Sequence, residues 1–320
     1  MRGVQLQRGI AGACVNSRRR SLATAAAVLE EAPICRKKSL LVDGNNALYH
    51  FYDPLSTVEH DGIQTGAVDG LLRLLRRMDK THQPEHISVV FDSRQRPTTR
   101  RIIQPDYKTD RAPTPQSLVP QFAYAKEVFS KANVNCIERP GMEADDIIAS
   151  YSTQYTTAGF DVLLISNDND FLQLVHDGVN VETDAEATDS SVSDSIDLAP
   201  AVVEIYQPSR RRYIRERNLR GRFFGLHPKL LPDFHALCGH HWKRLPRVSN
   251  LTDEKAVQLL IEYGGLYPLL RQLDSLDDPV LCKTLKQCIT SVESSYRMVK
   301  LIDTVKLPVA IDELRRPQLN

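Results

Sequence analysis

The stretch Ser39-Leu40-Leu41-Val42-Asp43 is a short apolar run that ends at an aspartate. Two later runs have the same form: Ile87-Ser88-Val89-Val90-Phe91-Asp92, and Val162-Leu163-Leu164-Ile165-Ser166, which leads to Asp168. Continuous apolar runs of this length are typical of strands that are buried on both faces of a parallel sheet. Val134-Asn135-Cys136-Ile137 is a fourth candidate strand.

The segments between these runs carry helical periodicity. Apolar residues recur three and four positions apart in residues 68–78 and again in residues 122–129. Strands that alternate with helices predict an α/β fold with a mostly parallel sheet. From Pro228 to about Leu301 the pattern is helical, with breaks near Pro246 and Gly264-Gly265, so a helical region is expected to follow.

The aspartates at the strand ends are the first candidate site. Parallel strands place their carboxyl ends on one edge of the sheet, where ligands bind in open α/β folds. A fourth acidic segment, Glu143-Ala144-Asp145-Asp146, follows the fourth strand and opens a predicted helix. A single aspartate after a strand is often only a turn or capping residue, but four such sites on one edge favour a cation site. Oxygen ligands without thiolates suit Mg²⁺ or Mn²⁺.

Basic residues lie just beyond the Asp92 strand end. They are Arg94, Arg96, Arg100, Arg101, Lys108 and Arg111. A cationic segment beside a carboxylate–metal edge fits a polyanionic substrate and metal-assisted phosphodiester hydrolysis. A solvated loop is the alternative.

A change of composition follows Val181. Residues 182–197 carry six acids and no base, which predicts a mobile acidic loop. Seven arginines then fall within Arg210–Arg222, which predicts a phosphate-binding patch. The patch residues expected to bind nucleic acid, together with Arg100 and Arg101, are Arg210, Arg211, Arg212, Arg215 and Arg217. Neutralisation of this segment by the acidic loop is the alternative.

Composition narrows the class of protein further. The 320 residues have a formal charge of +1 and no run of about 20 apolar residues, so a membrane partner is not expected. The first 29 residues hold five arginines and no acid, which predicts a mitochondrial transit peptide over residues 1–35 and location in the matrix. A basic tail is the alternative. Six dispersed cysteines predict reduced, structural thiols.

Five segments together resemble the 5′-nuclease domain of bacterial DNA polymerase I and its phage and flap-endonuclease relatives. They are residues 41–46 (LVDGNN), 89–92 (VVFD), 107–111 (YKTDR), 141–146 (GMEADD) and 165–170 (ISNDND). The resemblance implies a PIN-like domain at 36–182 with a helical arch and a degenerate helix-three-turn-helix domain at 223–308. The composition adds an acidic and arginine-rich insertion at 183–222 between them, and a tail follows at 309–320.

The same resemblance implies roles for individual residues, because that family cuts 5′ ends and flaps with two divalent metals. The first metal site would be built by Asp43, Asp92, Glu143 and Asp145, with Asp146 beside them. Asp168 and Asp170 would contribute to the second site. Lys108 and Arg111 match catalytic residues at the base of the arch that contact the scissile phosphate.

The chain departs from the family in three places, and the longer acidic loop and arginine run is one of them. Residues 239–246 (GHHWKRLP) place His240 and Lys243 where the family has two aspartates, which reduces the second metal site, since a protonated lysine cannot ligate Mg²⁺. The glycine-rich DNA-gripping hairpin is replaced by residues 247–252 (RVSNLT). His235, Cys238, His240 and His241 match no common zinc spacing and are expected to be ordinary polar surface.

Two functions of different classes remain open. The first is a metal-dependent 5′-3′ exonuclease or flap endonuclease that uses Mg²⁺ or Mn²⁺, with DNA favoured over RNA as the substrate. The second is a catalytically degenerate homologue that binds nucleic acid or assists assembly of a mitochondrial ribonucleoprotein. The near-complete acidic set favours the first, whereas the lost aspartates and glycines favour the second.

Overall fold

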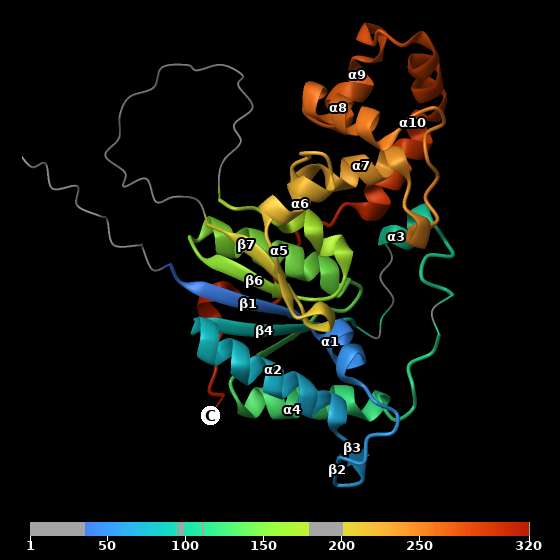
Figure 1. Ribbon diagram of the computed structural model, residues 1–320. Helices are drawn as coiled ribbons and strands as arrows, with labels where there is room; N and C mark the ends of the chain where they lie inside the picture. The colour runs from blue at the N-terminus through green and yellow to red at the C-terminus, as the bar shows by residue number, and fades with distance from the viewer. Residues whose placement is uncertain (1–35, 94, 96–98, 111, 179–200, 320) are drawn as a thin grey trace, which may run out of the picture. The chain divides into compact units, whose positions relative to one another are not determined.

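The computed structural model of the chain describes residues 36–93, 95, 99–110, 112–178 and 201–319 (Figure 1). Arg36–Asn320 groups as one compact unit. The predicted transit peptide, the acidic loop at 182–197, Arg94, Arg96 and Arg111 lie outside the described residues. Those predictions therefore stay predictions.

A six-stranded sheet forms the centre of the described part, in the order β5-β4-β1-β6-β7-β8. The strands are β1 (Lys38–Asp43), β4 (His86–Phe91), β5 (Asn135–Glu138), β6 (Asp161–Ile165), β7 (Val203–Gln207) and β8 (Arg212–Ile214). All neighbours pair in parallel except β7 and β8. The four predicted strands and the mostly parallel α/β fold are thus confirmed.

Helices cover both faces of the sheet, as Figure 1 shows. The helices α1 (Gly44–Phe51), α2 (Gly66–His82) and α4 (Val119–Lys131) pack against one face, in a core that contains Leu40 and Val42. The helix α5 (Ala144–Thr157) covers the other face, in a core that contains Leu41. Successive residues of β1 point to opposite faces, so its continuous apolar run supplies both cores.

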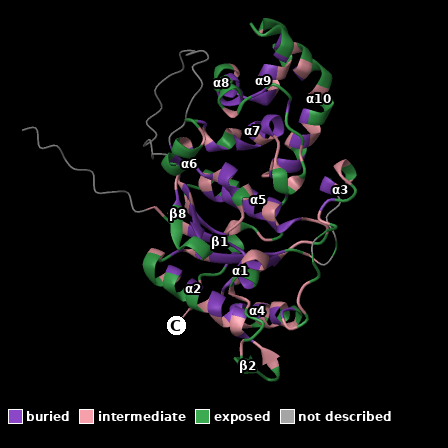
Figure 2. Cartoon of the chain, turned by 45° about the vertical axis from the view of Figure 1, so that its right-hand side comes forward, coloured by how far each residue is buried: buried purple, intermediate pink, exposed green. Residues whose placement is uncertain are grey.

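The C-terminal half is helical, as predicted. It contains α6 (Glu216–Arg222), α7 (Leu231–Cys238), α8 (Asp253–Tyr263), α9 (Leu266–Arg271), α10 (Pro279–Val299) and the single turns η3 (Pro228–Leu230), η4 (His241–Lys243) and η5 (Leu273–Ser275). Its apolar residues join those of α5 in one continuous hydrophobic core. Figure 2 shows the buried residues of α5 and α7. The helical half is therefore packed on the sheet half.

Two parts of the predicted organisation need correction. The structure places residues 203–214 in the sheet as β7 and β8, and not in an insertion, because Val203 and Ile205 are buried and extend the apolar pattern. Residues 309–319 are not a free tail. They contain the turn η6 (Ile311–Glu313), Leu314 is buried, and the Arg315 amide donates to Asn135 Oδ1 at 3.0 Å.

The remaining elements are short. They are the hairpin of β2 (Glu59–His60) and β3 (Ile63–Gln64), the helix α3 (Thr99–Ile103), and the turns η1 (Asn169–Leu174) and η2 (Pro208–Arg210). The helix α3 and the loop through residue 110 occupy the place of the expected arch, between β4 and α4. In the described part of the chain, no helix combines the length and apolarity that crossing a membrane would require.

Candidate active site

Three strand ends bring their aspartates together at the carboxyl edge of the sheet. Asp43 is the last residue of β1, Asp92 directly follows β4, and Asp168 follows β6 and caps η1. Asp92 Oδ1 also accepts a hydrogen bond from the Ala144 amide at 2.9 Å, which fixes the first turn of α5, and with it Asp145, at the same edge. The acidic segments that the sequence singles out therefore meet at one place.

Three of the carboxylates lie close enough to share one cation. One ligand oxygen each from Asp145, Asp168 and Asp170 falls within 4.8 Å of the others. A local turn holds this spacing, since Asp168 Oδ1 accepts from the Asp170 amide at 2.9 Å. Among the described residues, this is the group of at least three potential ligands whose ligand atoms all lie within 4.8 Å of one another. The histidine–cysteine set at 235–241 does not form one.

The negative charges of the acidic cluster, formed by Asp145, Asp168 and Asp170 with Asp43 and Asp92 beside them, repel one another. Burial, with added repulsion from Asp92 and Asp168, raises the pKa of Asp43 to about 7, although hydrogen bonds from the Asn46 amide and the Ser166 hydroxyl act against the rise. Burial, with repulsion from Asp43 and Asp168, likewise raises the pKa of Asp145 well above its usual value. Carboxylates in this state fit a hard divalent cation, which supplies the missing positive charge.

Two ammonium groups pair with acids of the cluster. Lys108 forms an ion pair with Glu143, and its Nζ lies 3.9 Å from Asp145 Oδ2. Lys243 Nζ lies 2.6 Å from Asp170 Oδ2 and donates to the Met298 carbonyl at 3.4 Å. Lys243 stands where the family resemblance expects an aspartate. At that position, therefore, a positively charged side chain contacts Asp170 instead of a further carboxylate.

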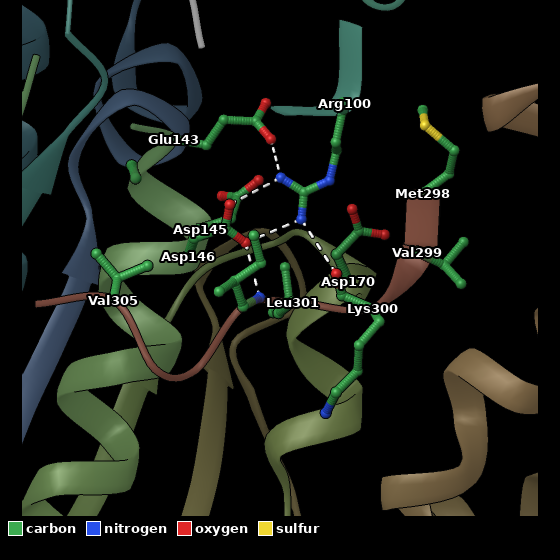
Figure 3. Close-up of polar contacts among 12 residues, drawn as sticks. Arg100, Glu143, Asp145, Asp146, Asp170, Met298, Val299, Lys300, Leu301 and Val305 are labelled. Atoms are coloured by element: carbon green, nitrogen blue, oxygen red, sulfur yellow. Dashed lines mark hydrogen bonds and ion pairs between the residues drawn. The ribbon is translucent and has the colours of Figure 1, made fainter. Parts of the chain in front are cut away.

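Arg100 has a different place from the one predicted. The sequence analysis groups it with nucleic-acid-binding residues, but its side chain is only 4% exposed. It donates to both oxygens of Asp146 at 2.9 Å, to Glu143 and to the Lys300 carbonyl (Figure 3). Arg100 is therefore an internal counter-ion in this structure. Sequence alone could not reveal this, because nothing in the local pattern distinguishes Arg100 from the neighbouring basic residues.

The same network changes the expectation for two predicted metal ligands. Glu143 accepts from Arg100 and Lys108, and Asp146 Oδ1 accepts from the Ile302 amide at 2.9 Å as well as from Arg100. Burial by itself would raise the pKa of Glu143, but the charges of Lys108 and Arg100 outweigh it and hold that pKa low. In the structure both carboxylates are neutralised by cations of the chain, while the aspartates of the cluster are not fully neutralised.

The arginine-rich segment is spread over the turn η2, the strand β8 and the helix α6. Arg210 ends η2 beside the site, where the Ser209 amide donates to Asn167 Oδ1 at 2.9 Å. The chain then runs back along β8, antiparallel to β7, so Arg215 reaches Glu204 at the other end of the hairpin and forms an ion pair. The predicted residues Arg211, Arg212 and Arg217 are exposed along this path, and Arg101 on α3 is half-buried.

A cavity of about 750 Å³ opens over the acidic cluster. It is lined by the three clustered aspartates with Asn167, by residues of the segment 104–110 that include Lys108, and by residues 240–244. Sequence reasoning did not identify two residues of the site. Ser166 donates to Asp43 Oδ2 at 3.0 Å, and Trp242 lines the cavity. The position of Ser166, next to a strand end, was the available signal for the first.

Known proteins share both sequence and fold with this chain. Residues 38–201 match the family described as the 5′-3′ exonuclease, N-terminal resolvase-like domain. The chain is 29% identical to the 5′-3′ exonuclease of Aquifex aeolicus, over 89% of each protein. It is 32% identical to DNA polymerase I of Rhizobium leguminosarum over 86% of this chain, but it spans only 25% of that polymerase.

The solved structures show the same fold. The D15 protein of phage T5, co-crystallised with metal ions, superposes with a TM-score of 0.61 at 18% identity, over 83% of this chain and 90% of that one. The mostly parallel, nuclease-type α/β fold is therefore established for this chain independently of its sequence motifs.

Replacing Arg100 should destabilise the protein strongly. Arg100→Met leaves Glu143 and Asp146 as buried charges with fewer partners, which costs about 3–5 kcal/mol when a buried pair is broken. Urea unfolding at neutral pH measures the loss. Arg101→Met, half-buried on the same helix, is the matched control and should change stability little. Equal losses for the two variants would contradict the role assigned to Arg100.

Stability without metal should depend on pH through Asp43. Because its pKa is raised from 3.8 to about 7, the native state keeps a proton that the unfolded chain releases. This contribution is fully present below about pH 4 and is lost as the pH rises through about 7. Unfolding in EDTA across this range should show the decline, and Asp43→Asn should reduce it.

Added Mn²⁺ should restore the stability at pH 7.5, because a ligand that binds only the native state adds RT ln(1 + [L]/Kd). The Asp43→Asn variant should gain less from Mn²⁺ than the wild type. A wild-type melting temperature that does not respond to millimolar Mn²⁺ would count against the cation site.

Proposed function

The chain belongs to the 5′-3′ exonuclease family through its N-terminal resolvase-like domain, and on that premise we propose that it is a metal-dependent 5′-nuclease that hydrolyses phosphodiester bonds in DNA. The observation that carries the proposal is the group formed by Asp145, Asp168 and Asp170 with an ammonium group, Lys108, at its side. Both features face one open cavity, so a phosphate that enters it reaches them together.

The carboxylates would hold the cation and Lys108 would hold the phosphate. When bound, a divalent cation supplies Lewis-acid chemistry that favours attack of water on phosphorus. Burial alone would lower the pKa of Lys108, but Asp145 and Glu143 raise it above its ordinary value, so Lys108 stays protonated. A fixed ammonium can then stabilise the negative charge that develops on the phosphate oxygens. Arg111 is proposed to assist from the same segment.

Lys243 supports a site with a single divalent cation. Its ammonium occupies the side of the cluster next to Asp170 and is only 11% exposed, so a second cation there would meet a fixed positive charge. Asp43 and Asp92 add negative charge near this group, and the pKa of Asp43 and of Asp145 is raised by burial and by repulsion between the acids. We assign the one cation, as Mg²⁺ or Mn²⁺, to the group of Asp145, Asp168 and Asp170.

DNA is the preferred substrate on the strength of the relatives. The T5 flap endonuclease that shares this fold was crystallised in a complex with DNA and metal ions. The polymerase relatives are DNA enzymes by name. We propose cleavage at 5′ ends or flaps for this chain, within the mitochondrial matrix if the basic N-terminal segment acts as a transit peptide.

A second function is favoured by one specific observation. The same Lys243–Asp170 ion pair that leaves room for one cation also weakens the acidic set, as expected for a homologue that binds nucleic acid without cutting it. Such a protein could act in a mitochondrial ribonucleoprotein. The two functions differ in one measurable property, which is metal-dependent cleavage by the purified chain.

Cleavage should require Asp145. Full-length protein with Mg²⁺ or Mn²⁺ is expected to release the labelled 5′ end of a flap substrate, and Asp145→Ala should slow this by at least about a hundredfold, as loss of a charge-stabilising group does. Asp277→Ala, at an exposed position that does not line the cavity, is the control and should cleave normally. Tight DNA binding without cleavage by the wild type would favour the second function.

The number of bound cations should depend on Lys243. Calorimetric titration with Mn²⁺ should find a single site in the wild type and an additional site in Lys243→Asp, because the substitution removes a positive charge and adds an oxygen ligand. Lys243→Gln removes the charge without adding a carboxylate and is the matched control. Two equivalent sites in the wild type would show that Lys243 does not exclude a second cation.

A further inference from the structure

Trp242 is the only tryptophan of the chain, and its side chain is unusually open to solvent. The residue is 89% exposed and lines the cavity that contains the acidic cluster. A large aromatic ring gains most of its energy from contact with another surface. Its exposure beside the candidate active site, in place of packing in the core, indicates that its contact surface comes from outside the chain.

The turn that carries Trp242 is held in place by contacts of the residues that precede and follow it in the chain. Lys243 is held by Asp170 and by the Met298 carbonyl, and Arg244 forms an ion pair with Asp110. His240 and Leu245 exchange backbone hydrogen bonds of 3.3 and 3.1 Å, which closes the turn.

Backbone geometry constrains this turn further. Gly239 has a φ of +77°, and a Cβ there would lie 2.8 Å from the Leu245 carbonyl oxygen, so only glycine fits without a shift. The indole, in contrast, contacts one other aromatic ring in the described part of the chain, that of its neighbour His241, with the ring centroids 5.5 Å apart. The indole is therefore a free ring on a fixed support.

The surroundings of the ring identify the chemistry of its partner. Lys108, Lys243 and Arg244 line the same cavity as five aspartates, so positive charge for a phosphate backbone comes from these side chains together with the divalent cation that the proposed function assigns to the aspartates. Exposed aromatic rings beside a phosphate-binding groove are how proteins hold single-stranded nucleic acid, because each base can stack on the ring. A protein partner would not require the combination of an exposed indole, three cations and a carboxylate cluster within one cavity.

We propose that Trp242 is a stacking platform for an unpaired base of the substrate strand, next to the phosphodiester bond that lies over Asp145. A base inside a duplex has both faces covered by its neighbours, whereas an unpaired or terminal base has a free face for the indole. Trp242 would thereby make the site select strands with an unpaired end. This inference rests on the proposed nuclease function and adds a specificity residue to it.

The sole tryptophan provides a direct probe. Indole fluorescence of the full-length protein is followed in Ca²⁺, while an oligothymidylate or a blunt-ended hairpin duplex of equal length is added. Stacking should quench the fluorescence with the single strand, and much less with the duplex. Equal quenching by both ligands, or by neither, would overturn the proposal.

Affinities measured with labelled oligonucleotides complete the test. Trp242→Ala should weaken single-strand binding by about tenfold, in line with the loss of one stacked base, and should change duplex binding little. Trp242→Phe keeps a ring and should recover most of the affinity. Phe224→Ala, which removes a 57%-exposed aromatic ring outside the cavity, is the control and should bind as the wild type does.

The outcomes separate this proposal from the proposed function. Unchanged single-strand affinity in Trp242→Ala would overturn the stacking platform, even if Asp145→Ala still abolished cleavage. Equal weakening of single-strand and duplex binding would also overturn it, since it would leave no preference for an unpaired base. Because Trp242 is exposed, the melting temperatures of its variants should match the wild type, so a loss of binding cannot be attributed to unfolding.

Discussion

Repulsion among carboxylates at the carboxyl edge of the sheet is the constraint on which the rest of the structure depends. Parallel pairing of β1, β4 and β6 brings their terminal aspartates together. Burial then makes each negative charge more costly. Three cationic side chains of the chain offset this charge: Arg100, Lys108 and Lys243. Each of them comes from a segment outside the sheet. The positions of those segments are thereby tied to the acids.

Arg100 connects parts of the chain that are far apart in sequence (Figure 3). It sits on α3, pairs with two acids around the start of α5, and donates to the carbonyl of Lys300 just after α10. The Ile302 amide, two residues further along, donates a hydrogen bond to Asp146 Oδ1. Together with the shared apolar core, this network fixes the helical half of the protein on the sheet. The geometry of the site consequently depends on the helical half as well.

Sequence reasoning succeeded where local pattern decides the structure. The apolar runs that end at Asp43 and Asp92 predicted both strands and the shared edge, since chain direction in a parallel sheet leaves no other place for their ends. It did not predict the burial of Arg100, which depends on where distant segments return, or the ion pair of Arg215 with Glu204 across a hairpin. The number and spacing of charged residues in the sequence do not show which of them will pair in the fold. The position of Lys243 was flagged by resemblance, but its contact with Asp170 required the fold.

The turn at residues 240–244 joins two properties that substrate recognition needs. Lys243 points from it to Asp170 and adds a positive charge to the acidic cluster, while Trp242 lines the same cavity with its ring exposed. The backbone pair of His240 and Leu245 closes the turn that carries both side chains, so the same contacts position the ammonium and the ring. A base stacked on Trp242, as we propose, would therefore lie beside the acids whose charge Lys243 partly offsets.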